Sequence, residues 1–138
     1  MPPGNDAMQD DATAERMDRV LRAYEGWNRD GVQRFSRFLS DDATLADAPE
    51  LPDARMTRGR PEVVRRLEEV ARSVGGGSVE IRGVEPRGDA VLVTMTWNLE
   101  ASGGAEVSVG DVFHLVEVEG DKICGIRVFL HLESVPDA

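Results

Sequence analysis

The sequence predicts an α+β fold in which an antiparallel sheet curves around helices. Apolar residues recur at helical spacing up to about residue 74, and from about residue 79 they alternate with a period of two. Short glycine-containing turns separate the alternating segments, which is typical of antiparallel strands that follow one another in the chain. The length of 138 residues fits one domain. We therefore expect a concave sheet face that packs on a helix or lines a cavity.

The first helix is predicted to begin near Thr13. Residues 1–12 are rich in proline, glycine and acidic side chains and show no periodicity, which predicts a disordered acidic tail ahead of a single domain over residues 13–138. Apolar residues then recur at intervals of three and four and form one stripe, made of Met17, Val20, Leu21, Tyr24 and Trp27. Asp30 and Gly31 end this helix.

Four segments are predicted between the first helix and the main strands. A short helix covers residues 32–39, and an extended segment over residues 43–47 places alternate side chains on one face. The prolines within residues 48–59 indicate a loop. Pro61 fits the first turn of a third helix, which is predicted to end at three glycines beginning with Gly75.

Four strands are predicted in the second half of the chain, near residues 79–84, 91–99, 107–115 and 126–132. The pair Gly120-Asp121 indicates a tight hairpin between the last two. On the last three strands the predicted core face consists of Val91, Val93, Met95, Trp97, Leu99, Val107, Val109, Asp111, Phe113, Leu115, Ile126, Val128, Leu130 and Leu132.

The composition argues against several classes of partner and site. The 26 acidic residues against 16 lysines and arginines give a net charge of −10, which argues against nucleic acid and anionic membranes as partners. A lone cysteine, Cys124, excludes a disulfide framework within the chain, and two histidines leave little for a histidine-rich metal site. No apolar run is long enough to span a bilayer and no secretion signal is evident, so we expect a cytoplasmic protein.

Asp111 is the most informative candidate for a functional residue. The alternation places it between Val109 and Phe113 on the apolar face of its strand. A carboxylate buried there is costly unless it is paired or protonated, which indicates a functional group. Three other interpretations stay open: an error of one residue in the face assignment, a bulge at Gly110 that turns Asp111 outward, or a salt bridge to an arginine.

Asp47 and Tyr24 are the other candidate catalytic residues. Asp47 comes at the end of an extended segment and just before a loop, a usual place for a catalytic residue, although turn-forming aspartates are common there too. Tyr24 lies on the core stripe, where its hydroxyl needs a partner, as it would in any buried tyrosine. Trp27 and Trp97 fit either the core or the wall of a pocket.

The histidines are predicted to lie away from any pocket. His114 has the opposite parity to Asp111, so we expect it on the other face of the sheet, as a surface or interface residue. His131 receives the same interpretation, and Cys124 is interpreted as a packing residue.

Three stretches of the chain together resemble a known superfamily. They are "AYEGWNRDGVQRFSRFLSDDATLADAP" over residues 23–49, "TRGRPEVVRRL" over residues 57–67 and "VGDVFHLVEVEGDKICGIRVF" over residues 109–129. In this order they resemble the nuclear-transport-factor-2-like superfamily, and within it the SnoaL-like polyketide cyclases and ketosteroid isomerases. The resemblance implies a cone-shaped sheet whose open end is a mostly apolar pocket, commonly in a homodimer, without a metal or organic cofactor.

The resemblance also implies roles for the candidate residues. Asp47 would be the general base that removes a proton next to a carbonyl, while Asp111, kept protonated, and Tyr24 would donate hydrogen bonds to the resulting enolate. The ligand would be a hydrophobic, polyketide-like or steroid-like carbonyl compound that is isomerised or closed in an aldol-type step. The residues of the apolar wall would be Trp27, Val93, Met95, Trp97, Phe113, Ile126 and Val128.

Two alternatives stay open beside this enzyme. An epoxide hydrolase of the same fold would use Asp47 and Asp111 with an arginine, either Arg58 or Arg127. A module that binds ligands or dimerises without catalysis would use the outer face of the sheet as its interface, through Thr94, Thr96, Asn98, His114 and Arg127. Fold alone does not decide between these functions.

Overall fold

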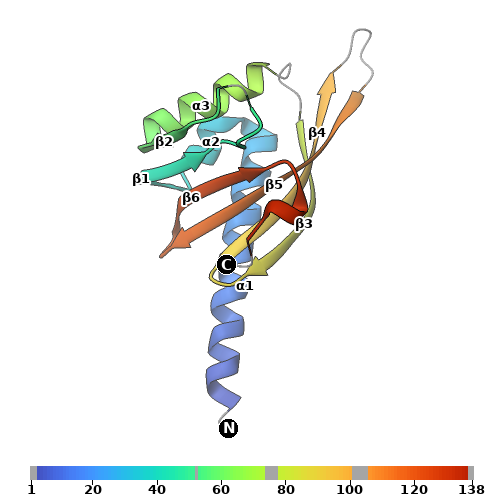
Figure 1. Cartoon of the computed structure of the whole chain (residues 1–138). Helices are drawn as coiled ribbons and strands as arrows, with labels where there is room; N and C mark the ends of the chain where they lie inside the picture. Colours follow the sequence, from blue (N-terminus) through green and yellow to red (C-terminus); the bar gives the residue numbers. More distant parts are fainter. Residues whose placement is uncertain (1–2, 52, 74–77, 101–105, 137–138) are drawn as a thin grey trace.

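The structure is a computed structural model that describes residues 3–51, 53–73, 78–100 and 106–136 (Figure 1). The elements follow in the order α1 (Pro3–Asp30), α2 (Val32–Ser36), β1 (Leu39–Ala46), β2 (Met56–Arg58), α3 (Arg60–Ser73), β3 (Ser78–Arg87), β4 (Ala90–Glu100), β5 (Glu106–Glu119), β6 (Lys122–Phe129) and the 3₁₀ helix η1 (Leu132–Ser134). Helices dominate the first half and strands the second, as the change of period predicts. The glycine run predicted to stop the third helix lies outside the described residues.

The six strands form one sheet in the order β2-β1-β6-β5-β4-β3. The sheet is curved and does not close on itself, and α1 runs along its inner face (Figure 1). The α+β prediction is confirmed. One pairing differs from a purely antiparallel sheet, because β1 and β6 run parallel. These strands are separated in the chain by α3 and four strands, so no short turn constrains their relative direction.

The first helix begins well before the predicted start. Residues 3–12, expected as a disordered tail, continue α1, whose N-terminal part extends beyond the sheet (Figure 1). This stretch contains good helix formers such as Ala7, Met8 and Gln9. A helix already formed by packing of its later turns can be extended by such residues without an apolar stripe. Gly31, with a positive φ of 87°, ends α1 and opens α2.

A β-bulge in β5 decides which of its side chains face the helices. Thr96 of β4 pairs with Asp111, whereas Asn98 pairs with Ser108, so two steps along β4 match three along β5. The extra residue lies beside Gly110, where one of the alternative interpretations placed a bulge. Because side chains alternate along a strand, the insertion reverses the faces of every residue beyond it.

The predicted faces are therefore wrong for the second half of β5. Phe113 and Leu115 were expected on the concave face but belong to a separate cluster on the outer face. Val112 and Val116 pack in the core instead. On β4 and β6 the alternation is confirmed for the described side chains, whereas Leu132, predicted on the last strand, lies in η1 and is 48 % exposed. The side chains of Leu99, Val107 and Val109 lie outside the described part of the chain.

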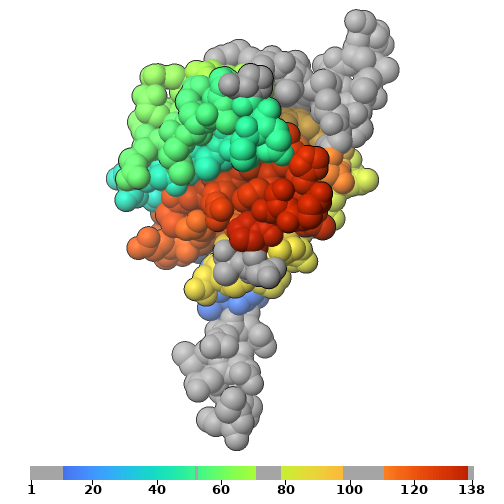
Figure 2. Space-filling view, in the orientation of Figure 1, coloured from blue at the N-terminus to red at the C-terminus, as the bar shows by residue number. Residues whose placement is uncertain are grey.

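Apolar residues are buried on both faces of the sheet. The main core, between the helices and the concave face, has as its largest fully buried side chains Tyr24, Phe35, Leu39, Leu45, Met95, Ile123 and Ile126. On the outer face Ala90, Leu92, Phe113, Leu115 and Val135 form the smaller cluster, against which Phe129 packs. The C-terminal residues supply Val135 by folding back over this face (Figure 2).

Replacing Phe35 by alanine should lower the free energy of unfolding by about 3–5 kcal/mol, because the deletion leaves a cavity in the core. Phe35 is fully buried. The centroid of its ring lies 5.0 Å from the ring centroid of Tyr24 and 5.3 Å from that of Trp27. Urea denaturation monitored by circular dichroism measures the change. Met56→Ala, at a residue that is 62 % exposed, is the control and should stay within about 0.5 kcal/mol. Equal losses in the two variants would contradict this core assignment.

Candidate functional site

A largely apolar cavity of about 170 Å³ lies between the helices and the concave face of the sheet. Its walls come from α1, β1 and the loop that follows, α3, β4, β5 and the end of β6. Most wall side chains are aliphatic or aromatic, Asp47 and His114 are the charged or titratable residues in the wall, and the surface of the cavity is almost wholly apolar. An apolar cavity with a few polar groups is the usual form of a small-molecule site.

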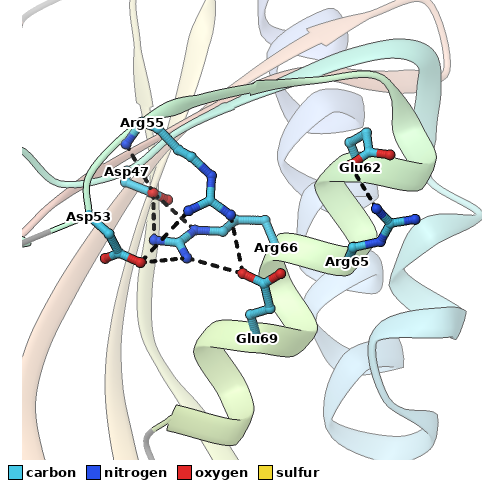
Figure 3. A network of polar contacts seen from close by, with 7 residues as sticks. All are labelled: Asp47, Asp53, Arg55, Glu62, Arg65, Arg66 and Glu69. Carbon is cyan, nitrogen blue, oxygen red and sulfur yellow. Dashed lines mark hydrogen bonds and ion pairs between the residues drawn. The ribbon is translucent and has the colours of Figure 1, made fainter.

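Asp47 is held at the end of β1 by two hydrogen bonds and an ion pair to one oxygen. Its Oδ2 accepts hydrogen bonds from Nε of Arg66 at 3.0 Å and from the backbone N–H of Arg55 at 3.2 Å, and it lies 2.7 Å from Nη2 of Arg66 in an ion pair (Figure 3). The Asp47 backbone N–H donates to the carbonyl of Arg55 at 3.1 Å. The carboxylate is only 3 % exposed, so the guanidinium offsets the cost of burying its charge.

Arg66 joins Asp47 to two further carboxylates. Its Nη1 lies 3.2 Å from Asp53 Oδ2 and 3.3 Å from Glu69 Oε2, and Arg55 also reaches Glu69 at 3.2 Å (Figure 3). We refer to these five residues as the Arg66 network. Hydrogen bonding to Asp47 is the main cause that raises the pKa of Arg66 above its usual value, so the guanidinium stays charged. Hydrogen bonds to Arg66 are also the main cause that lowers the pKa values of Asp53 and Glu69.

Arg66 is not among the arginines proposed from the sequence, and the two that were named, Arg58 and Arg127, lie elsewhere. Arg58 is exposed on β2, and Arg127 is exposed with its guanidinium 5.4 Å from the centre of the Phe129 ring. A signal for Arg66 was present in the helical spacing. It stands three residues after Val63 and so shares the buried face of α3. A charged residue on such a face needs a buried partner.

His114 lines the cavity, and a hydrogen bond joins its ring to the hydroxyl of Tyr24. The Tyr24 hydroxyl and His114 Nδ1 lie 2.7 Å apart, and the two residues are 1 % and 4 % exposed. Burial lowers the pKa of His114 to about 4, so the imidazole is neutral near neutral pH. Burial also raises the pKa of the Tyr24 hydroxyl, which therefore keeps its proton. The prediction that His114 faces away from the pocket is wrong, and the bulge in β5 is the reason.

Asp111 does not share the cavity with Asp47. Its side chain is exposed on the outer face, where its Oδ1 accepts a hydrogen bond from the Thr96 hydroxyl at 2.8 Å. The prediction that Asp111 lies on the cavity face is therefore wrong. Tyr24 is buried but does not itself line the cavity, and its hydroxyl contacts the lining residue His114.

The predicted apolar wall is divided between three environments. Trp27, Trp97 and Val128 line the cavity. Val93, Met95 and Ile126 are buried in the main core behind it. Phe113 lies on the outer face because of the bulge.

Trp97 carries a polar atom that lacks a partner. Its indole Nε1 is buried, and among the described residues it finds no acceptor. The ring meets that of Trp27 edge to face, with centroids 6.3 Å apart. Buried N–H groups without acceptors are rare in folded proteins, and this one belongs to a residue that lines the cavity.

The lone cysteine lies in a different hollow. Cys124 borders an acidic depression of about 430 Å³ that also includes Asp89 and Glu117. Burial raises the pKa of its thiol, and the charges of Glu117 and Glu119 raise it further. The thiol therefore stays protonated and is a poor nucleophile. Within the described residues, no cluster of three or more potential ligands is placed to hold a metal ion. No helix among the described residues is long and apolar enough to cross a bilayer.

The buried histidine should make stability depend on pH. The unfolded chain gives His114 its ordinary pKa near 6.5, whereas the folded pKa is about 4, so acid protonates the unfolded state first. We expect this residue to remove about 2–3 kcal/mol of the free energy of unfolding between about pH 7.5 and about pH 4.5. Urea denaturation of wild type and His114→Gln at both pH values measures the difference, and the variant should show the flatter dependence.

His131→Gln is the matched control, because His131 is 59 % exposed. It should keep the pH dependence of the wild type. Parallel curves for wild type and His114→Gln would contradict the neutral, buried state of His114.

Solved structures of several proteins share this fold. A putative SnoaL-like polyketide cyclase from Jannaschia sp. CCS1 has a TM-score of 0.70 and 18 % identity, covering 88 % of this chain and 89 % of its own. A ketosteroid isomerase-like protein from Catenulispora acidiphila, in complex with trimethylamine, has a TM-score of 0.65 and 17 % identity over 85 % of this chain and 88 % of its own. An NTF2-like protein of unknown function from Burkholderia pseudomallei has a TM-score of 0.68 and 15 % identity, over 85 % and 91 %.

At sequence identities this low, the similarity to these solved structures shows a shared fold and nothing further. No curated protein matches the chain. The model of the SnoaL-like domain family, however, matches residues 20–126, which is more than half of the sequence. The matched region contains Asp47, Arg66 and His114 together with the strands that form the cavity. The chain therefore belongs to the SnoaL-like domain family, within the nuclear-transport-factor-2-like superfamily.

Proposed function

We propose that the protein is a small-molecule enzyme that moves a proton next to a carbonyl group. One observation carries this proposal: a mostly apolar cavity brings together the Asp47 carboxylate, the neutral His114 imidazole and the unpartnered Trp97 N–H. These are a base and hydrogen-bond donors, which is what enolate chemistry requires. The SnoaL-like family, whose members bind small molecules or act as cyclases and isomerases, is consistent with this reaction class.

Asp47 is the proposed general base. The Arg66 network holds its Oδ2, and neither the two hydrogen bonds nor the ion pair described for Asp47 uses Oδ1. Oδ1 takes the proton from the carbon next to the substrate carbonyl, and the electrons of the broken C–H bond move to the carbonyl oxygen as an enolate. Return of the proton to another carbon completes an isomerisation. Attack of the enolate carbon on a second carbonyl completes an aldol-type ring closure.

The developing negative charge on oxygen needs donors that are already in place. Trp97 supplies an indole N–H, and His114 supplies a neutral imidazole. Hydrogen bonds to a growing charge are strong inside an apolar cavity, because no water competes for the donors. These two residues take the place that the family resemblance assigned to Asp111 and Tyr24.

The size of the cavity limits the substrate. Its volume of about 170 Å³ is close to the roughly 150 Å³ of an engineered cavity that binds benzene. Sites for drug-sized molecules measure about 300–1,000 Å³. A monocyclic carbonyl compound therefore fits this cavity, and a steroid-like substrate requires it to widen.

A second candidate function is ligand binding without chemistry. The observation that favours it is the engagement of Asp47 with Arg66, which gives the carboxylate a structural role that needs no substrate. The epoxide hydrolase alternative has less support. Arg66 does bridge two aspartates, Asp47 and Asp53, but Asp53 is 65 % exposed and does not line the cavity.

Proton exchange at carbon separates the two candidates. Cyclohexanone in deuterated buffer should exchange its α-protons faster with the wild-type protein than without it, as followed by proton NMR. Asp47→Asn keeps the shape but removes the base, so we expect the catalysed rate to fall by about 100-fold or more.

Asp111→Asn is the matched control, because the structure places Asp111 outside the cavity on the other face. It should exchange at the wild-type rate. Equal catalysed rates in Asp47→Asn and wild type would overturn the base assignment, and no acceleration with any small enolisable ketone would favour the binding module.

Arg66→Met should lower the free energy of unfolding by about 3–5 kcal/mol, because it leaves the buried Asp47 charge without a partner. Arg65→Met is the matched control on the same helix: Arg65 is 65 % exposed and pairs only with Glu62 among the ion pairs described. It should change stability by about 0.5 kcal/mol or less. In the double variant Asp47→Leu/Arg66→Met most of the loss should be recovered, since no charge is left buried. A mild Arg66→Met together with a more damaging double variant would contradict this account.

A further inference from the structure

We infer that Tyr24 is a positioning residue: its hydroxyl fixes the proton of His114 on Nε2, so that the imidazole presents an N–H donor to the cavity and selects ligands that carry a carbonyl oxygen. The role in catalysis rests on the proposed function, whereas the effect on binding does not. Three observations support this role of Tyr24: its contact with His114, the burial of both side chains and the apolar surroundings of the tyrosine.

Two arrangements of protons are compatible with a hydroxyl and a ring nitrogen 2.7 Å apart. In the first, the Tyr24 O–H donates to an unprotonated Nδ1, and the single proton of the neutral ring sits on Nε2. In the second, Nδ1 carries the proton and donates to the Tyr24 oxygen, which leaves Nε2 as an acceptor. The two differ in what the imidazole offers to a molecule in the cavity.

The second arrangement leaves the tyrosine proton without an acceptor. Tyr24 is 1 % exposed, and its described hydroxyl contact is with His114. The ring of Tyr24 also packs against two aromatic rings, with centroid distances of 6.3 Å to Trp27 and 5.0 Å to Phe35. A buried hydroxyl that donates to nothing is costly. The first arrangement satisfies both groups, and it is therefore the one that the packing of α1 against β5 selects.

The choice of proton position gives the cavity a defined polarity. With the proton on Nε2, His114, which lines the cavity, offers an N–H donor to a bound molecule. Because burial keeps the imidazole neutral, this donor persists across the neutral pH range. A neutral imidazole can polarise a carbonyl in this way. The wall therefore favours a ketone over a hydrocarbon of the same shape.

The position of the proton can be measured directly in the free protein. Long-range correlation of ring protons with ¹⁵N in labelled protein distinguishes a protonated from an unprotonated ring nitrogen. His131→Gln removes the signals of the other histidine, because the chain has two. At pH 7 we expect His114 to show one form, with Nδ1 unprotonated and Nε2 protonated. A protonated Nδ1 would overturn the inference.

Ligand selection provides the second measurement. Cyclohexanone and methylenecyclohexane have nearly the same shape but differ in the acceptor oxygen. Both tryptophans of the chain line the cavity, so indole fluorescence reports binding of either compound. We expect Tyr24→Phe to admit the form protonated on Nδ1 and to weaken cyclohexanone binding by about two- to fivefold, as the competent fraction falls. Binding of methylenecyclohexane should stay unchanged.

The background His114→Gln tests whether Tyr24 acts through the histidine. Glutamine keeps an N–H donor near the position of Nε2 but has no proton position for Tyr24 to control. In this background Tyr24→Phe should have no further effect on cyclohexanone binding. An equal loss in both backgrounds, or an equal loss for both ligands, would assign Tyr24 a merely structural role and overturn the inference.

These outcomes are separable from the proposed reaction. If exchange at carbon does not depend on Asp47 while the His114 proton sits on Nε2 and the ketone is preferred, the proposed enzyme fails and the binding inference stands. If Nδ1 carries the proton, the inference fails whatever the exchange rate.

Discussion

A carboxylate that is 3 % exposed needs a cation beside it, and Asp47 obtains one from α3. The same constraint, that a polar group buried in an apolar site must find a partner, governs the rest of the cavity. His114 finds its partner in Tyr24, from α1. The indole N–H of Trp97 finds none among the described residues. Each partnered group is thereby held by an element other than its own, and the cavity exists only when helices and sheet are assembled.

Burial gives the two partnered groups different chemistry. The Arg66 network surrounds one oxygen of Asp47 with cationic and backbone donors, which favours a charged carboxylate. His114 is buried against the ring and hydroxyl of Tyr24, and burial favours a neutral imidazole. A charged base and a neutral donor in one cavity form a complementary pair for moving a proton next to a carbonyl. The Arg66 network also ties the loop after β1 to α3, so it positions both the base and one wall of the cavity (Figure 3).

The β-bulge beside Gly110 explains most of the difference between the predicted and the observed site. A period of two is reliable only along an uninterrupted strand, and one inserted residue exchanged Asp111 for His114 on the cavity face. Arg66 was missed for a different reason. Its partner Asp47 is 19 residues away in the chain, and no local pattern indicates that a helix and a strand end will meet. The α+β class, the apolar face of β4 and the position of Asp47 at the cavity were predictable, because each depends on periodicity or on resemblance of nearby motifs.

The sequence by itself determined the order of the elements apart from β2, whose residues Met56–Arg58 were predicted as part of a loop, together with the aromatic stripe of α1 and a family whose members enclose an apolar cavity. These follow from local spacing, since hydrophobic periodicity is written directly in the chain. Only the tertiary structure decided which polar residues meet in the cavity. That choice depends on a strand register, on the pairing of Asp47 with Arg66 and on the contact of Tyr24 with His114 across 90 residues. Long-range partners of this kind are selected by the cost of burying unpaired polar groups, which acts only once the elements are packed together.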